Sequence, residues 1–290
     1  SESKARGYPP AVIERVWSVI EGFSSFGFCK AHGAAFALPT YQSAWLKTHY
    51  PVEFMAGLFT HDPGMYPRRL LISEARRLGV KLLPVDVNKS TDEYRVEGDG
   101  VRMAIHELSG ISTAEVERIL KNQPFKDIGD FYLRAKPARR TLENLALIGA
   151  LDSLTGEGFA ATRGDILARV RQLNAIKNRP LGDSMQPTLD FTLLEQLPSG
   201  NPEMTTAEKV GHEMSIMKMD VSEHVLELYR PMLDEMGVLR ADELVGLRSK
   251  TEVLVAGVRV ATQTPPMRSG KRVVFVTLDD GTGCSDSTFF

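Results

Sequence analysis

Apolar residues recur every three or four positions over most of the first 177 residues, which predicts a largely helical region. Residues 11–23, for example, place Val12, Val16 and Ile20 on one side of an amphipathic helix. With proline and glycine as start and stop signals, the same pattern predicts helices at 34–48, 52–59, 67–78, 113–120, 127–134, 138–151, 161–177 and 204–236. Residues 24–33, rich in glycine and serine, are expected to form a loop.

Pro39 falls within the helix predicted at 34–48 and leaves two possibilities open. Because proline has no backbone N–H to donate, it either opens a second helix at its first turn or kinks a longer one.

Runs of β-branched residues predict strands at 81–87 and 94–104, on either side of a polar turn. Three more strands are expected at 252–261, 271–280 and 284–290. Asp279 and Asp280 end the middle strand, where aspartate is typical of turns. Since three strands cannot close a five-stranded barrel, we expect the chain to stop inside a domain, and to begin inside one as well.

The composition, 42% hydrophobic and 25% charged, is that of an ordinary soluble protein. No apolar run approaches the roughly 20 residues that span a bilayer, and the first 20 residues do not form a signal peptide. Cys29 and Cys284 have no partners at zinc-finger spacing. We therefore expect a cytoplasmic protein without a membrane partner.

Charge is distributed unevenly along the chain. Residues 1–180 carry 25 basic and 20 acidic side chains, whereas residues 181–247 carry 4 basic and 13 acidic ones. This asymmetry indicates that the two parts face different partners, although chance and a solvated acidic helix explain it equally well.

A turn between two predicted helices, Gly110-Ile111-Ser112, has the form of a helix-hairpin-helix. Small residues let backbone N–H groups approach a phosphate, and the next helix offers its positive N-terminus. Ser112 or Thr113 can cap that helix, with Glu115 in its first turn. Residues 102–140 hold 8 basic and 5 acidic side chains, which suits DNA. The alternative is an ordinary helical corner.

Two further segments are candidates for binding. GFCKAHGAA (27–35) joins Lys30 and His32 to glycines and could meet phosphate, or could be a surface loop. QPTLDF (186–191) presents Leu and Phe on a linker that contains four prolines, which often marks a docking site. Alternatively, this linker packs back onto its own domain. A complete metal or nucleotide motif is missing: after His212-Glu213 the HExxH pattern fails at Ile216, and there is no GxxxxGK[ST] loop.

These segments together resemble the bacterial C-family DNA polymerases, the DNA polymerase III alpha subunits. FSSFGFCKAHGAAFALPTYQSAWLKTHYPVEFMAGL (23–58) is similar to their fingers segment, and LGVKLLPVDVNKS (78–90) to the next block. The hairpin, QPTLDF and the final strands follow in the family's order, so the resemblance covers nearly the whole chain. HDPGMYPRRL (61–70) is closer to the error-prone, damage-associated branch. Ser112 replaces a hairpin glycine of the family, and a second hairpin near 147–151 matches in part.

The resemblance implies a multidomain α+β chain, mainly helical and ending in an incomplete OB-fold barrel. The implied domains are outer fingers (1–82), tandem helix-hairpin-helix (83–178), a linker with a clamp-binding motif (179–203), a helical connector (204–250) and the start of the OB fold (251–290). Implied partners are duplex DNA, single-stranded template, a sliding clamp and accessory lesion-bypass proteins. The candidate DNA contacts are Lys30, His32, Gly110, Ile111, Ser112, Arg118, Lys121, Arg139 and Arg140, and the clamp contacts are Gln186, Leu189 and Phe191.

The resemblance also implies where catalysis takes place. The family's catalytic aspartates and their Mg²⁺ belong to a palm domain upstream of the fingers. We therefore expect this chain to carry no catalytic or metal-binding residue and no cofactor, and to be inactive alone although it is part of a DNA-directed DNA polymerase. The alternative is a non-catalytic protein-interaction scaffold of a replication or repair complex. The absence of a complete catalytic motif argues against an independent small enzyme.

Overall fold

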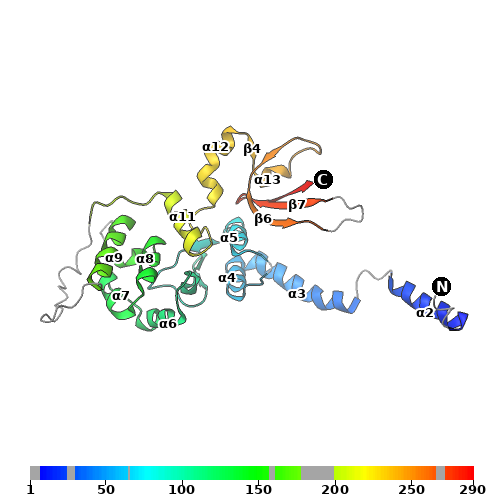
Figure 1. Ribbon diagram of the computed structural model, residues 1–290, viewed down its shortest axis with the longest axis horizontal. Coiled ribbons are helices and arrows are strands. Elements are labelled where there is room, and N and C mark those ends of the chain that lie inside the picture. Colours follow the sequence, from blue (N-terminus) through cyan, green and yellow to red (C-terminus); the bar gives the residue numbers. More distant parts are fainter. Residues whose placement is uncertain (1–6, 25–29, 65, 157–160, 178–198, 266–271) are drawn as a thin grey trace. The chain divides into compact units, whose positions relative to one another are not determined.

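The computed structural model describes residues 7–24, 30–64, 66–156, 161–177, 199–265 and 272–290. The chain divides into two compact units, Ser1–Tyr50 and Pro51–Phe290, and each is described by itself. Figure 1 labels the elements of both units.

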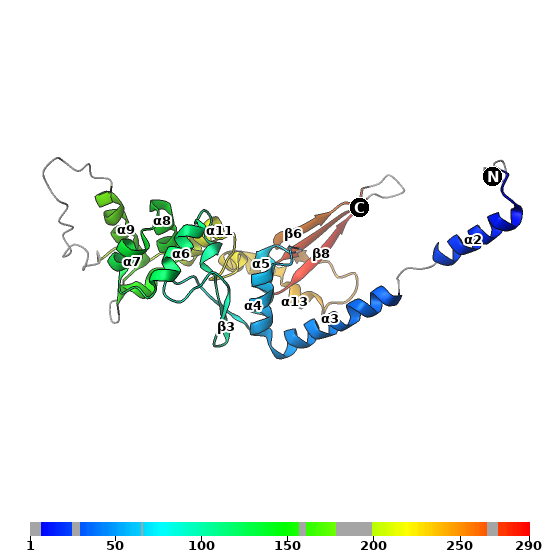
Figure 2. The same ribbon diagram turned by 90° about the horizontal axis from the view of Figure 1, so that it is seen from below.

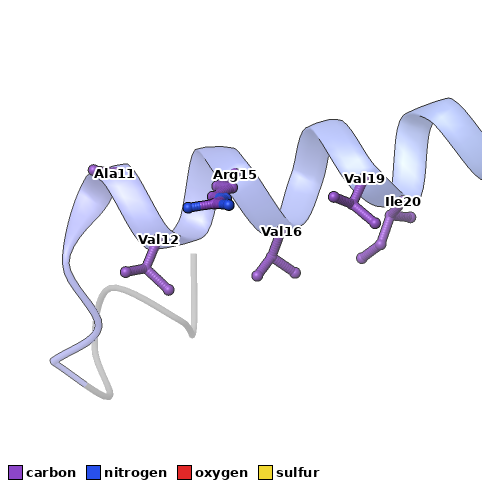
Figure 3. A pocket seen from close by; sticks show the side chains of 6 residues that line it. All are labelled: Ala11, Val12, Arg15, Val16, Val19 and Ile20. Carbon is purple, nitrogen blue, oxygen red and sulfur yellow. The ribbon is translucent and has the colours of Figure 1, made fainter.

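The first unit consists of two helices, α2 (Pro10–Ser24) and α3 (Lys30–His49). Pro39 lies inside α3, so a second helix does not begin there. The loop expected at 24–33 is wrong in its last part, because α3 already begins at Lys30. The apolar stripe of α2 is confirmed: Val12, Val16, Val19 and Ile20 line a shallow hollow along one side of the helix (Figure 3), and their exposed fractions are 48–53%.

The second unit opens with two helices and a small sheet. Helices α4 (Pro51–His61) and α5 (Arg68–Arg77) precede strands β1 (Lys81–Leu83), β2 (Arg95–Glu97) and β3 (Gly100–Arg102). The sheet order is β1-β3-β2, with β3 parallel to β1 and antiparallel to β2. The single strand expected at 94–104 is therefore wrong. It is a hairpin, because Gly98, at a φ of 62°, reverses the chain.

A helical region follows the sheet. It contains the 3₁₀ turn η1 (Ile105–Glu107), helices α6 (Thr113–Asn122), α7 (Ile128–Ala135) and α8 (Arg139–Leu147), the 3₁₀ turn η2 (Asp152–Thr155) and helix α9 (Arg163–Lys177). The helix expected at 138–151 ends four residues early, because Gly149 adopts a φ of 81°.

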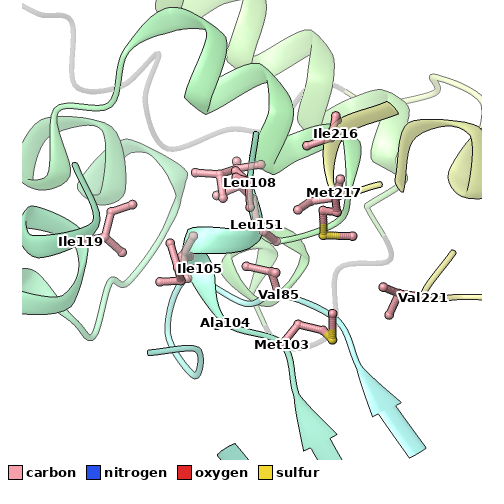
Figure 4. Close-up of a cluster of buried hydrophobic side chains, with 14 of the residues drawn as sticks. Val85, Met103, Ala104, Ile105, Leu108, Ile119, Leu151, Ile216, Met217 and Val221 are labelled. Carbon is pink, nitrogen blue, oxygen red and sulfur yellow. The ribbon is translucent and has the colours of Figure 1, made fainter. Parts of the chain in front are cut away.

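The core lies where these elements meet (Figure 4). Side chains from the strands, the hairpin and α6, including Met103, Ile105 and Ile119, pack with Leu151 and Met217. All five are at most 4% exposed. The residues around the predicted hairpin are thus anchored by their apolar neighbours.

The helix expected at 204–236 is interrupted. Helix α11 (Thr206–Ile216) is followed by irregular backbone, then by η3 (Val225–Tyr229) and α12 (Arg230–Glu235). The interruption contains Asp220, which is fully buried and accepts a hydrogen bond from the Val225 N–H at 3.1 Å. A side-chain acceptor replaces helical carbonyls here, so apolar spacing alone overestimated the length of the helix.

The last part of the unit is a three-stranded antiparallel sheet of β6 (Val258–Gln263), β7 (Val274–Asp279) and β8 (Cys284–Phe289). Before it, β4 (Val238–Leu239), α13 (Ala241–Leu244) and β5 (Leu254–Val255) form a short connection, in which β5 pairs with β4. The strand expected at 252–261 is therefore two strands. Within the described residues no sheet closes into a barrel. Helix α5 lies beside this sheet (Figures 1 and 2), where Ser73 donates a 2.7 Å hydrogen bond to Asp279.

Among the described residues, no helix is both long and apolar enough to cross a membrane.

Candidate nucleic-acid interface

The predicted hairpin is a tight turn between η1 and α6. The N–H of Ile111 donates to the carbonyl of Leu108 at 3.2 Å, and Gly110 sits at a φ of 85°, which favours glycine. The N–H of Ser109 donates to the carbonyl of Ile216 at 3.0 Å, which ties the turn to the end of α11. Gly110 itself is exposed, so the tip of the turn is accessible from solvent.

Ser112, and not Thr113, is the N-cap of α6. Its hydroxyl accepts from the Glu115 N–H at 3.3 Å, and the Glu115 carboxylate accepts from the Ser112 N–H at 3.1 Å and the Ser112 hydroxyl at 2.8 Å. This reciprocal pair is a capping box, which satisfies the N–H groups of Ser112 and Glu115 at the start of the helix. The sequence pattern Ser-x-x-Glu is typical of a capping box and could have predicted it.

Glu115 also reaches a second helix. Its other carboxylate oxygen accepts from the Ala138 N–H at 2.9 Å, and Ala138 is the N-cap of α8. Burial raises the pKa of Glu115, but hydrogen bonds from Ala138, Ser112 and Thr141 outweigh that effect and hold the pKa below its ordinary value. No sequence signal indicates this contact, because it joins residues 23 positions apart.

The second hairpin, near 147–151, is closed to solvent. Gly149, Ala150 and Leu151 are all buried. A Cβ added to Gly149 would run into the guanidinium of Arg163, which pairs with Asp152 at 3.3 Å. This turn therefore offers no accessible backbone N–H groups, and its role is in packing.

The candidate cations of the region lie close to one another. The Arg118 Nε donates to the carbonyl of Ala135 at 3.1 Å, which places α6 beside the end of α7. Lys121 follows Arg118 by three positions and so lies on the same side of α6. Lys136 follows Ala135 directly and is exposed.

The first turn of α8 adds two arginines. Arg139 is exposed but pairs with Glu143 at 3.0 Å. Arg140 is exposed, and within the described part of the chain neither it nor Lys121 nor Lys136 forms an ion pair. Lys136 was not among the candidate contacts, although it is one of the eight basic side chains of residues 102–140 and precedes Arg139 and Arg140.

The other candidate residues lie elsewhere. Lys30 and His32 belong to α3 in the first unit, and the His32 ring contacts Phe36 at 4.5 Å between centroids. Gln186, Leu189 and Phe191 lie outside the described residues.

Phe275 on β7, a possible stacking residue for single strands, is 40% exposed. Its neighbours across the sheet are Gln263 and Thr288, and Asp286 lies two positions from Thr288 on the same side of β8. A single aromatic residue beside a carboxylate is a weak platform for nucleic acid.

The residues described here do not fit a catalytic metal centre. No group of three His, Cys, Asp or Glu side chains among them is placed to hold an ion. Asp279 and Asp280 are used internally, as expected of turn residues: Asp279 accepts from Ser73 at 2.7 Å and Gly281 N–H at 3.0 Å, and Asp280 from Ala241 N–H at 2.7 Å.

One family of protein motifs matches the region that contains the two turns. Residues 79–159 match the helix-hairpin-helix motif family. The matched segment contains both turns described above, together with the cations of α6, α7 and α8.

The full chain is similar to bacterial DNA polymerases. It is 34% identical, over all of its length, to 30% of an error-prone DNA polymerase of Symbiobacterium thermophilum. It is 34% identical over 97% of its length to 26% of an error-prone DNA polymerase of Dechloromonas aromatica. It is 30% identical over 99% of its length to 25% of the DNA polymerase III subunit alpha of Campylobacter jejuni.

Over nearly its whole length the chain is therefore similar to the C-terminal part of DNA polymerase III alpha subunits and error-prone DNA polymerases. The resemblance expected from the sequence is confirmed. The chain spans less than a third of the length of these relatives.

Proposed function

We propose that residues 79–159 hold duplex DNA by its backbone as part of a DNA-directed DNA polymerase. The observation that carries this proposal is the group of exposed cations around α6, α7 and α8 within a helix-hairpin-helix match. Cations fixed on folded helices neutralise phosphates and release counterions, and they position DNA without reading its bases.

The test is a salt titration of the 290-residue chain with a fluorescent 20-base-pair duplex. Binding should weaken steeply with salt, with a log–log slope of about −0.9 per neutralised phosphate. Lys136→Ala with Arg140→Ala should flatten the slope by about 1.8, whereas Arg248→Ala with Lys250→Ala, two exposed cations elsewhere, should leave it unchanged.

The scaffold alternative makes the opposite prediction. A chain whose partners are proteins should bind duplex DNA little, and without a steep dependence on salt. Binding that depends strongly on base sequence would contradict backbone recognition.

Three finer proposals rest on the order of segments along the family. QPTLDF is proposed to tether the polymerase to a sliding clamp through Gln186, Leu189 and Phe191, since Leu and Phe on a proline-rich linker suit a docking peptide. The β6–β8 sheet is proposed to begin an OB fold that meets single-stranded template. The error-prone names of two of the relatives support lesion bypass with accessory proteins.

Polymerisation itself is proposed for the whole protein, with Mg²⁺ held by carboxylates of a palm domain and not by this chain.

A further inference from the structure

The carboxylate of Glu115 accepts hydrogen bonds at the beginning of two helices. Glu115 accepts from the Ser112 N–H and hydroxyl at the start of α6, and from the Ala138 N–H at the start of α8. Glu115 itself is 7% exposed, so its carboxylate is largely buried. Two helix N-termini, each carrying partial positive charge, therefore converge on a single internal anion.

In a hairpin that binds DNA through backbone N–H groups, a phosphate would lie at the start of the second helix, which here is α6. Phosphate binds at helix N-termini because free N–H groups and the helix dipole point toward it. Here the Ser112 N–H already donates to Glu115. The carboxylate also carries the same sign of charge as a phosphate, so it repels any phosphate approaching α6 or α8 at this point.

Resting on the proposed DNA-binding function, we infer that Glu115 acts as an internal substitute for phosphate, which occupies the Ser112 and Ala138 amides and leaves the contact to side-chain cations. Ser112 contributes to this arrangement, because its hydroxyl donates a hydrogen bond to the carboxylate. The DNA-contacting groups are then Lys121, Lys136 and Arg140, which extend from exposed positions and need no access to the turn.

The first test compares two substitutions with the same change in net charge. Glu115→Gln removes the internal anion and keeps its shape. Glu117→Gln is the matched control, since Glu117 is exposed and, two positions along, points to another side of α6. At 50 mM salt, Glu115→Gln should raise affinity for duplex DNA about three- to tenfold, and Glu117→Gln less than about twofold.

A second variant opens the turn completely. Ser112→Gly with Glu115→Ala removes the carboxylate and places glycine at the N-cap, where it costs only a few tenths of a kcal/mol relative to serine. Its affinity for DNA should also rise, and its salt slope should steepen by about 0.9 for each additional phosphate that the freed amides bind. Circular dichroism confirms that each variant is folded before its affinity is compared.

Equal affinities of Glu115→Gln and Glu117→Gln, with wild-type binding intact, would overturn the inference and leave the proposed function standing. Absence of DNA binding in the wild type and in all variants would overturn both. An unchanged salt slope in the double variant would show that the amides bind no phosphate, and would also count against the inference.

Discussion

Replacing Asp279 by alanine should destabilise the second unit strongly, because this carboxylate joins elements far apart in sequence. Asp279 is 1% exposed and accepts from Ser73 of α5 at 2.7 Å and from the Gly281 N–H at 3.0 Å. The Nε2 of His224 lies 3.6 Å from it. Removal leaves buried donors without a partner, which we expect to cost about 3–4 kcal/mol.

The measurement is thermal unfolding followed by circular dichroism. For a unit of this size, about 2–4 °C is lost per kcal/mol, so the midpoint should fall by roughly 10 °C. Asp92→Ala is the control, since Asp92 is exposed and within the described residues its side chain makes no hydrogen bond, so its cost should stay within about 0.5 kcal/mol. Equal midpoints for the two variants would refute the reasoning.

The carboxylate of Asp279 should also make the stability of the second unit depend on pH. Burial raises the pKa of Asp279, but the His224 ring 3.6 Å away and the hydrogen bonds from Ser73 and Gly281 outweigh that effect and lower the pKa below its ordinary value. A carboxyl with a depressed pKa in the folded state contributes stability above its unfolded pKa, about 3.9, and loses it as pH falls through the folded pKa. The stability difference between wild type and Asp279→Asn should therefore shrink below about pH 4.

Three further outcomes are expected. Gly281→Ala should lower the free energy of unfolding, measured by thermal unfolding, by about 2 kcal/mol, because Gly281 has a φ of 89° and a Cβ there would meet the His224 ring at 2.9 Å. Gly98→Ala, which has open space around it, should cost about half as much. Equal costs for the two variants would contradict the steric argument. Leu189→Ala with Phe191→Ala should weaken binding of a sliding clamp by roughly 2–4 kcal/mol in calorimetry and leave DNA binding unchanged. The 290-residue chain should not extend a primed template with Mg²⁺ and dNTPs, and extension that EDTA abolishes would show that a catalytic centre is present.

The spacing of apolar residues predicted correctly those helices and strands whose formation depends on residues near one another in the sequence. Most helices before residue 177 appear where apolar spacing placed them, and from α4 to α9 these helices contribute buried apolar side chains to the core. The errors fall where one residue overrides the pattern. Gly98 turns an expected strand into a hairpin, Gly149 shortens a helix, and the buried carboxylate of Asp220 interrupts another.

Contacts between distant elements could not be predicted in this way. Ser73 and Asp279 are 206 positions apart, and each reads as an ordinary surface or turn residue in its own segment. The candidate site was predicted in part: the hairpin and its cations lie in the region indicated, but the sequence could not show that one of its two turns is buried.

Ser112 shows how a segment can keep the sequence pattern of a motif without the chemistry that the pattern usually indicates. The loss of the second hairpin glycine suggested only a weaker approach to phosphate. In the structure the serine takes part in a capping box, and Glu115 extends that box to the start of α8. A glycine at this position would lack the hydroxyl that donates to the carboxylate, and without a carboxylate the N-termini of α6 and α8 would lack a shared anion. The serine that replaces the glycine therefore also helps to hold the internal anion, so the proposed contact with DNA depends on Ser112 and Glu115 together and not on the missing glycine alone.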